Sequence, residues 1–168
     1  VSTNRWHRWE SGKWTREPWP ESWTISQLAV THEETWWAAS SHGLVRRTAS
    51  GWEPEAIIDA GDRAWAVRSV RGVAVDASGQ LWFASKAGVG CRTSKGWRFF
   101  EGKDGLPWNE FTRIAAGRDG EVWFGTTRGA IRWDGREFHY RQGPRWLPHD
   151  EIIDVAVDRD GTAWFATK

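Results

Sequence analysis

Methionine is absent from the chain, tyrosine occurs once, and Cys91 is the single cysteine. One cysteine excludes an internal disulfide and assigns the chain to no compartment. No apolar run approaches the roughly 20 residues that a membrane-spanning helix requires, and no signal-peptide pattern is present. Because the chain begins at Val1, we expect a processed product or an excised fragment, which leaves room for a removed leader.

Neither sign of charge dominates the sequence. The 23 basic and 22 acidic residues leave a net charge of +1, and no basic block or stripe stands out. Nucleic-acid binding depends on Lys and Arg gathered on one face or along one segment. We therefore expect no nucleic-acid partner, and no membrane span in this chain.

Tryptophan is present in excess, at 16 of the 168 positions. Trp82, Trp123 and Trp164 lie 41 residues apart, and each is followed by phenylalanine and preceded three residues earlier by a turn glycine. Trp37 belongs to an earlier and more divergent copy, 45 residues before Trp82. A fixed period near 40 residues with an aromatic anchor is typical of a repeat array.

Each repeat predicts four short strands joined by tight turns. An alternating apolar stretch comes first, then an Asp/Gly turn, the Trp-Phe strand, a strand opened by Gly88 or Gly129, a second turn and a closing aromatic strand. Asp-Gly turns between alternating apolar runs are strong hairpin signals, and no stretch has the 3.6-residue period of a helix. The sequence therefore predicts an all-β fold, a β-propeller of four-stranded antiparallel blades.

The chain predicts a single domain, residues 1–168, with about four blade-equivalents. The approximate ranges are residues 25–57, 70–100 and 111–141, and a split blade that combines residues 5–18 with residues 152–168. Two alternatives follow for the split blade. The termini close a four-bladed ring, which would remove open strand edges, or the chain is part of a larger propeller completed by a remaining fragment or a second chain. The width of the Trp-rich blades favours the larger ring.

The repeat resembles the two-component regulator propeller repeat. Residues 105–109 (Gly-Leu-Pro-Trp-Asn), 119–126 (Asp-Gly-Glu-Val-Trp-Phe-Gly-Thr) and 129–132 (Gly-Ala-Ile-Arg) fit that family's pattern. The first third departs from it, because residues 33–35 (Glu-Glu-Thr) replace the Asp/Gly turn. The resemblance implies an extracytoplasmic module, periplasmic or extracellular, of the kind that bacterial hybrid histidine kinases use to recognise carbohydrate-derived ligands.

The tryptophans fall into two groups. The periodic ones, Trp37, Trp82, Trp123 and Trp164, occupy one strand position, where we expect a large ring to fill the wedge between neighbouring blades. Others lie off the period in the connecting loops, where exposed rings suit pyranose faces. The candidate ligand-binding tryptophans are Trp23, Trp65, Trp108 and Trp146, with Trp19 in the same class of loop. The alternative for each is that it caps a blade.

Polar side chains are expected on the same face as these loops. His42, Lys86 and Arg128 lie one or two residues before the glycines that open the third strands, and the Leu-Pro loops add a further set: Asn109, His149 and Asp150. Arg113 points to the channel in this interpretation. Together they could hold an anionic or polyhydroxylated ligand, and the alternative is a solvated polar rim.

No catalytic or metal-binding pattern is present. The five histidines lack metal-ligand spacing, no serine lies in a nucleophile elbow, and we expect no cofactor. The leading hypothesis is a non-catalytic module that binds a carbohydrate or small-molecule ligand on the loop face and passes the signal to a partner. The alternatives are a structural or protein-interaction propeller accessory to a larger enzyme or assembly, and a polysaccharide lyase or hydrolase. The last would require clustering of His149, Arg113 and Asp150.

Overall fold

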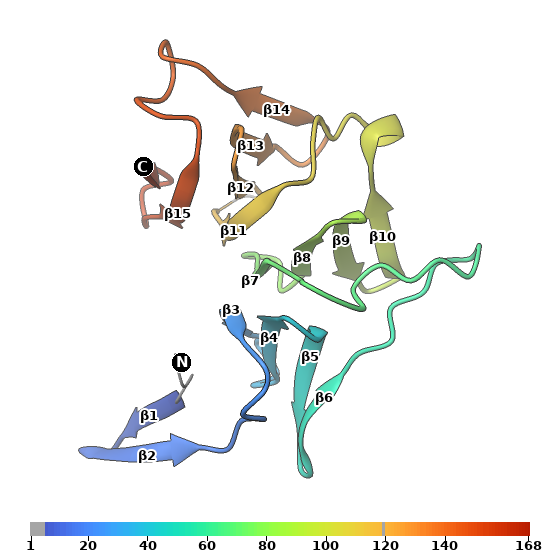
Figure 1. Cartoon of the computed structure of the whole chain (residues 1–168), viewed down its shortest axis with the longest axis vertical. Helices are drawn as coiled ribbons and strands as arrows, with labels where there is room; N and C mark the ends of the chain where they lie inside the picture. Colours follow the sequence, from blue (N-terminus) through green and yellow to red (C-terminus); the bar gives the residue numbers. More distant parts are fainter. Residues whose placement is uncertain (1–5, 119) are drawn as a thin grey trace.

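The computed structural model describes residues 6–118 and 120–168, which form antiparallel sheets arranged in an arc (Figure 1). Three sheets have four strands each and are numbered here blades 1 to 3. Blade 1 contains β3 (Ile25–Val30), β4 (Trp36–Ser40), β5 (Gly43–Thr48) and β6 (Gly51–Pro54). Blade 2 contains β7 (Gly72–Val75), β8 (Leu81–Ser85), β9 (Gly88–Thr93) and β10 (Gly96–Phe100). Blade 3 contains β11 (Phe111–Ala116), β12 (Val122–Thr126), β13 (Gly129–Trp133) and β14 (Phe138–Arg141).

A two-stranded hairpin lies at each end of the arc. The N-terminal hairpin contains β1 (Trp6–Glu10) and β2 (Lys13–Glu17), and the C-terminal hairpin contains β15 (Ile152–Val157) and β16 (Ala163–Thr167). One short 3-10 helix, η1 (Gly102–Asp104), follows blade 2. In the described part of the chain, no helix has the length and apolar character needed to cross a bilayer.

The predicted class, an all-β propeller of four-stranded antiparallel blades, is confirmed. The two hairpins do not form one closing blade in this structure. Within residues 6–118 and 120–168, β1 pairs only with β2 and β16 only with β15. The arc is open on the side where both termini lie (Figure 1). Residue 5, where the predicted split blade begins, and Asp119 of the third turn lie outside the described residues.

The periodic tryptophan of blade 2 is fixed by a carboxylate six residues earlier. Asp76 accepts the Trp82 indole N–H at 2.8 Å through one oxygen. Its other oxygen accepts the backbone N–H groups of Ser78 and Gln80, both at 2.9 Å, and so closes the turn between β7 and β8. One aspartate therefore sets both the hairpin turn and the orientation of the ring, which is 3% exposed.

The same device recurs at two other places in the chain. Asp158 holds the Trp164 N–H at 2.9 Å in the C-terminal hairpin, and Asp59 holds the Trp65 N–H at 2.8 Å in the loop after blade 1. These indole donors, together with backbone N–H groups, keep the pKa of each carboxyl below its usual range. The aspartates are therefore ionised acceptors at neutral pH.

Two copies lack the aspartate, and each leaves a buried indole N–H without an acceptor. Gly117 stands in blade 3 where Asp76 stands in blade 2, and the Trp123 N–H has no partner among the described residues. Thr31 stands at the same position in blade 1. Its hydroxyl accepts the Thr35 N–H at 3.2 Å, which retains the turn, but the Trp37 N–H has no partner among the described atoms. An unpaired buried donor costs about 1–3 kcal/mol.

Replacing Thr31 with aspartate should raise the free energy of unfolding by about 1 kcal/mol, because the carboxylate supplies the acceptor that Trp37 lacks. The measurement is chemical denaturation of the wild-type chain and T31D. In a W37F background, which has no indole donor, the same substitution should give no gain. An equal gain in both backgrounds would contradict the account of the Asp–Trp device.

A contact between the innermost strands of blades 1 and 3 contributes to the curvature of the arc. The Gln27 side chain of β3 reaches past β7 to the main chain of β11, donating to the Ile114 carbonyl at 2.6 Å and accepting the Ile114 N–H at 3.1 Å. Gly72 of β7 permits this approach, because a Cβ there would lie 2.5 Å from the Ile114 side chain. Blades 1, 2 and 3 are therefore tied together at the channel.

Candidate functional site

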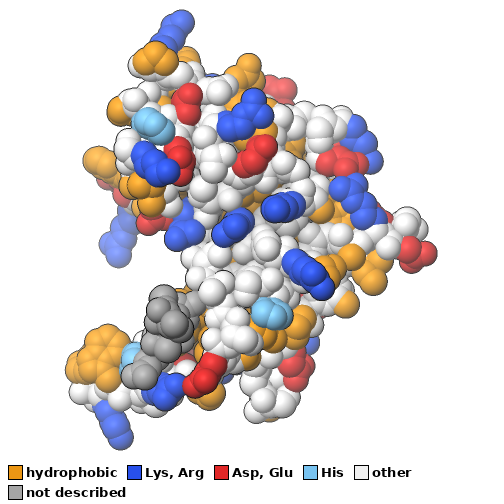
Figure 2. Space-filling view, in the orientation of Figure 1, with side chains coloured by type: hydrophobic (Ala, Val, Ile, Leu, Met, Phe, Trp, Pro, Cys, Tyr) orange, Lys and Arg blue, Asp and Glu red, His pale blue; other side chains and the backbone are white. Residues whose placement is uncertain are grey.

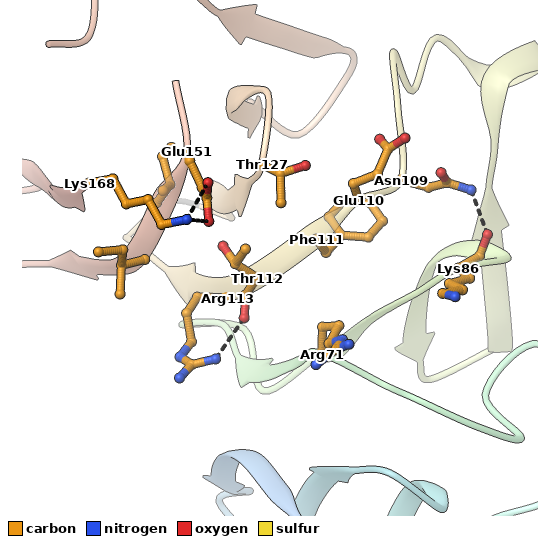
Figure 3. A pocket seen from close by; sticks show the side chains of 12 residues that line it. Arg71, Lys86, Asn109, Glu110, Phe111, Thr112, Arg113, Thr127, Glu151 and Lys168 are labelled. Carbon is orange, nitrogen blue, oxygen red and sulfur yellow. Dashed lines mark hydrogen bonds and ion pairs between the residues drawn. The ribbon is translucent and has the colours of Figure 1, made fainter. Parts of the chain in front are cut away.

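A groove of about 890 Å³ opens on the channel face, across blades 2 and 3 and the C-terminal hairpin (Figure 3). Its lining comes from the residues around the starts of the innermost strands and from the turns that follow the second strands. The lining residues are Arg71, Lys86, Asn109, Glu110, Phe111, Thr112, Arg113, Thr127, Glu151, Ile152, Ile153 and Lys168. The groove is therefore assembled from three successive repeats.

The repeat itself places these side chains together. Lys86, Thr127 and Lys168 occupy one repeat position, directly after the Trp-bearing strand. The Thr127 N–H donates to the Glu110 carbonyl at 3.0 Å, and the Lys168 N–H donates to the Glu151 carbonyl at 3.2 Å. Each of these turns is thus held beside the start of its own innermost strand, at one edge of the arc.

Positive charge dominates the groove. Arg71 and Lys86 are exposed, and neither forms an ion pair within the described residues. Arg113 donates to the Thr112 carbonyl at 2.8 Å and lies 3.6 Å from Asp154, whereas Lys168 is paired with Glu151. Figure 2 shows Lys and Arg side chains spread across the middle of this face. Arg71 and Lys86 are therefore available to bind an anionic group of a ligand.

Three sequence-predicted residues, Lys86, Asn109 and Arg113, line the groove together. The Asn109 side-chain amide donates to the Lys86 carbonyl at 2.5 Å, which ties the Leu-Pro loop to the neighbouring turn. Sequence reasoning missed Arg71, Glu110, Glu151 and Lys168. The signal for Lys168 was available, because it lies two repeat periods after Lys86.

Trp108 and Arg128 form a contact beside the groove. The Arg128 guanidinium lies 5.3 Å from the centre of the Trp108 ring, and the indole N–H donates to the Thr126 hydroxyl at 2.7 Å. Tyr140 meets the same ring edge-on at 5.3 Å. Trp108 also lines a smaller hollow of about 240 Å³ together with Asn109. This pair lies close to the groove without lining it.

The other loop tryptophans and His42 lie elsewhere. Trp146 is 53% exposed and is covered by the guanidinium of Arg141 at 4.5 Å. Trp23 stacks on His42, with ring centres 4.7 Å apart. Trp65 is 4% exposed and, besides its bond to Asp59, stacks on Phe99 at 4.5 Å. Trp65 thus presents no open ring face in this structure.

His149, Asp150 and Arg113 do not form a cluster around the groove. Only Arg113 lines it. His149 is exposed and accepts the Glu151 N–H, while Asp150 accepts the Gly143 N–H at 2.6 Å and so closes its own loop. Among the described lining residues the ionisable acids are Glu110 and Glu151, and none is a histidine. His149 and Asp150 therefore do not join Arg113 in the lining of the groove, as the lyase or hydrolase interpretation would require.

One group of potential metal ligands lies away from the groove, in the turn between β13 and β14. Ligand atoms of Asp134, Glu137 and His139 lie within 4.8 Å of one another. Backbone donation from Glu137, the His139 side chain and the Arg136 N–H hold the pKa of the Asp134 carboxyl well below its usual range. These hydrogen bonds already account for the arrangement as a turn.

Known proteins share this fold. The sequence profile described as "Two component regulator propeller" matches residues 105–128. No curated protein matches the chain by sequence. Virginiamycin B lyase from Staphylococcus aureus superposes with a TM-score of 0.68 at 20% identity, over 97% of this chain and 56% of the lyase.

Two sensor proteins of B. thetaiotaomicron are similar as well. The extracellular domain of the one component system BT4673 has a TM-score of 0.70 at 16% identity, over 94% of this chain and 24% of its own. The extracellular domain of the hybrid two component system BT3049 has a TM-score of 0.67 at 21% identity, over 86% of this chain and 20% of the BT3049 chain. The chain thus spans just over half of the lyase and about a quarter or less of the sensor domains. Residues 105–128 are similar to the two component regulator propeller repeat.

Proposed function

We propose that this propeller module binds an acidic carbohydrate in the channel-face groove without catalysing a reaction on it. The observation that carries the proposal is that Arg71 and Lys86 both line a groove of about 890 Å³. Neither side chain has an ion-pair partner in the described part of the chain. A volume of this size lies in the range of small-molecule sites. The cations would bind carboxylate or sulfate groups of the ligand.

The remaining lining suits the uncharged part of a saccharide. Asn109 and Thr127 offer an amide and a hydroxyl group that can bind ring hydroxyls. Ile153, a half-exposed side chain, adds apolar surface to the groove, on which the C–H faces of a pyranose can pack. Trp108, capped by Arg128, would contact a ligand longer than one or two sugar units.

We further propose that the module works outside the cytoplasm and passes ligand binding to a partner protein or domain. The similarity to extracellular domains of one component and hybrid two component systems supports this assignment. The non-catalytic assignment is supported by the lining residues. Glu151 is engaged by Lys168, and Glu110 stands without a histidine in the described groove.

The test is a binding screen of the purified chain against matched neutral and acidic oligosaccharides, with product analysis of every mixture. We expect acidic oligosaccharides to bind, neutral ones of equal length to bind much more weakly, and affinity to fall as salt rises. All sugars should be recovered intact. Binding indifferent to ligand charge would contradict the acidic class, and unsaturated or hydrolysed products would contradict the non-catalytic assignment.

An enzyme is the second candidate, because virginiamycin B lyase and a streptogramin B lyase share the fold. Glu110 is the exposed carboxylate at the groove that could serve as a base. If the groove were catalytic, E110Q would abolish turnover while leaving ligand binding intact. If the groove only binds its ligand, no product should appear in the screen with either the wild-type chain or E110Q.

A further inference from the structure

The channel-face groove continues outward past Asn109. The Asn109 side chain, which Figure 3 shows at one end of the groove, also lines the smaller hollow of about 240 Å³ beside Trp108. Glu101 lines this second hollow and a third one of about 380 Å³, which includes Asp59. Each hollow thus shares a residue with the next. The second and third hollows, from Asn109 past Glu101 to Asp59, are called here the blade 2 track.

The track crosses blade 2 from the channel to its outermost strand. The second hollow is lined by the turn between β8 and β9, with Ala87, and by the loop that returns from β10 to β11, with Trp108. The third hollow adds Phe99 of β10 and the loop after blade 1, with Arg63. All lining residues of the track lie within residues 59–109, and blade 2 has a four-stranded blade on either side (Figure 1).

Hydrogen bonds hold the walls of the track in place. Arg63 donates to the Ala87 carbonyl at 3.2 Å and to the Glu101 carboxylate at 2.6 Å, which ties the loop after blade 1 to both hollows. Lys103 lies 2.9 Å from the other oxygen of Glu101. Asp104 accepts the Glu101 N–H at 3.0 Å and closes the start of η1. The polar groups are therefore positioned before a ligand arrives, which lowers the entropic cost of binding.

The groups along the track suit sugar units. Each hollow has a partly buried aromatic ring in its lining, Trp108 in the second and Phe99 in the third. The C–H face of a pyranose can pack on such a ring. The Glu101 side chain lies between the two rings along the path and is 26% exposed. Its carboxylate can accept hydrogen bonds from ring hydroxyls, and such charge-assisted bonds are stronger than neutral ones.

Charge distinguishes the track from the groove. Three acids and two bases line the third hollow, namely Asp59, Glu101, Asp104, Arg63 and Lys103. Both bases are within ion-pair distance of Glu101, which is also the charged residue in the lining of the second hollow. An acidic sugar unit would therefore meet no unpaired cation in the described lining of the track. A neutral unit would meet hydrogen-bonding groups without repulsion.

We propose that the groove and the track together bind a linear oligosaccharide in which an acidic unit is followed by neutral units. The inference rests on the proposed function and names its substrate class, a chain of mixed charge. The acidic unit binds Arg71 and Lys86 in the groove. The neutral units leave the groove at Asn109, pass Glu101 and reach Phe99 at the outer edge of blade 2.

Two substitutions can block the track with little strain in the fold. Gly102 lines the second hollow, and its backbone lies outside the left-handed region. A Cβ at Gly102 would meet no atom within 4 Å, so the ring of G102F can extend into open space. Ala60 is exposed and lines the third hollow but not the second. We therefore expect G102F to block the whole track and A60F to block its outer part.

The test is isothermal titration calorimetry with a uronic acid monosaccharide and with oligosaccharides in which one uronic acid, at either end, terminates a neutral hexose chain of increasing length. For the wild-type chain, affinity should rise with each neutral unit to at least about tenfold above the monosaccharide, and then level off when the track is full. Uniformly acidic chains of the same lengths should gain less, because the track has no unpaired cation for them. An equal gain would overturn the mixed-charge assignment.

The variants locate the gain on the track. G102F should bind the monosaccharide within about twofold of the wild-type chain and lose the gain from neutral units. A60F should lose only the last part of the gain. The control A49F puts the same ring in the turn between β5 and β6, outside the lining of the groove and the track, and should change neither value.

The outcomes separate the track from the groove. A monosaccharide that binds with no gain from neutral units, or a gain that survives G102F, would overturn the track and leave the groove as the binding site. If no member of the series bound, the result would contradict the proposed function itself, and the inference with it.

Discussion

Reversing the charge of Arg71 and Lys86 together should weaken binding of an acidic oligosaccharide at least a hundredfold, or about 3 kcal/mol. The two side chains stand exposed in the groove, and neither has a carboxylate partner among the described residues. The double variant R71E/K86E removes two charge-assisted hydrogen bonds and adds repulsion. Isothermal titration calorimetry with the best acidic ligand of the screen measures the loss.

The matched control is K95E/R136E, which changes the net charge by the same amount in the turns between the two outer strands of blades 2 and 3, outside the lining of the groove. This control should bind within about threefold of the wild-type chain, because long-range effects of surface charge are screened by salt. Equal losses in both double variants would show that the ligand responds to the overall charge of the protein, and would contradict a specific site at the groove.

Truncating Trp82 to alanine should lower the free energy of unfolding by about 4 kcal/mol. The ring is almost completely buried among Phe100, Phe124 and Trp133, and its N–H satisfies the buried carboxylate of Asp76. The substitution leaves a cavity between blades 2 and 3 and removes one hydrogen bond from Asp76. Chemical denaturation followed by far-ultraviolet circular dichroism measures the change.

Trp146 provides the comparison for this prediction. It is a tryptophan of the same size that is half exposed on a loop, so W146A should cost less than about 1 kcal/mol. Similar losses for W82A and W146A would contradict the interpretation that the periodic tryptophans hold the blades together. If the W82A chain did not fold, that would agree with this interpretation, because the loss would then exceed the free energy of unfolding of the wild-type chain.

The repeat period predicted the parts of the fold that depend on local sequence. The 41-residue spacing of Trp82, Trp123 and Trp164 gave the strand order within a blade and the face on which the turns lie. Those turns include Lys86 and the Leu-Pro loop with Asn109, and the structure brings both to one groove. These features depend on the sequence within a single unit, which is why one sequence was sufficient.

Features that depend on contacts between repeats could not be predicted in the same way. The contact of Gln27 with Ile114 across an intervening strand, which contributes to the curvature of the arc, is such a feature. Trp65 was placed among the ligand-binding candidates because it lies off the period. Its aspartate, six residues earlier as in the periodic copies, would have indicated a packing role.

The split blade shows the limit of repeat arithmetic. The sequence identifies the N-terminal hairpin as the outer half of a blade and the C-terminal hairpin as the inner half. It does not say whether these two hairpins join each other, because that depends on the distance between the two ends of the arc, which is a property of the packed blades.

The most direct test of the central claim is to map the acidic ligand on the protein by amide chemical shifts in heteronuclear NMR spectra. The account predicts that the largest changes occur at the groove residues Arg71, Lys86, Thr112, Thr127 and Lys168, and that they disappear in R71E/K86E. Largest changes at the Trp23–His42 stack or around Trp146, with the groove amides unmoved, would contradict it.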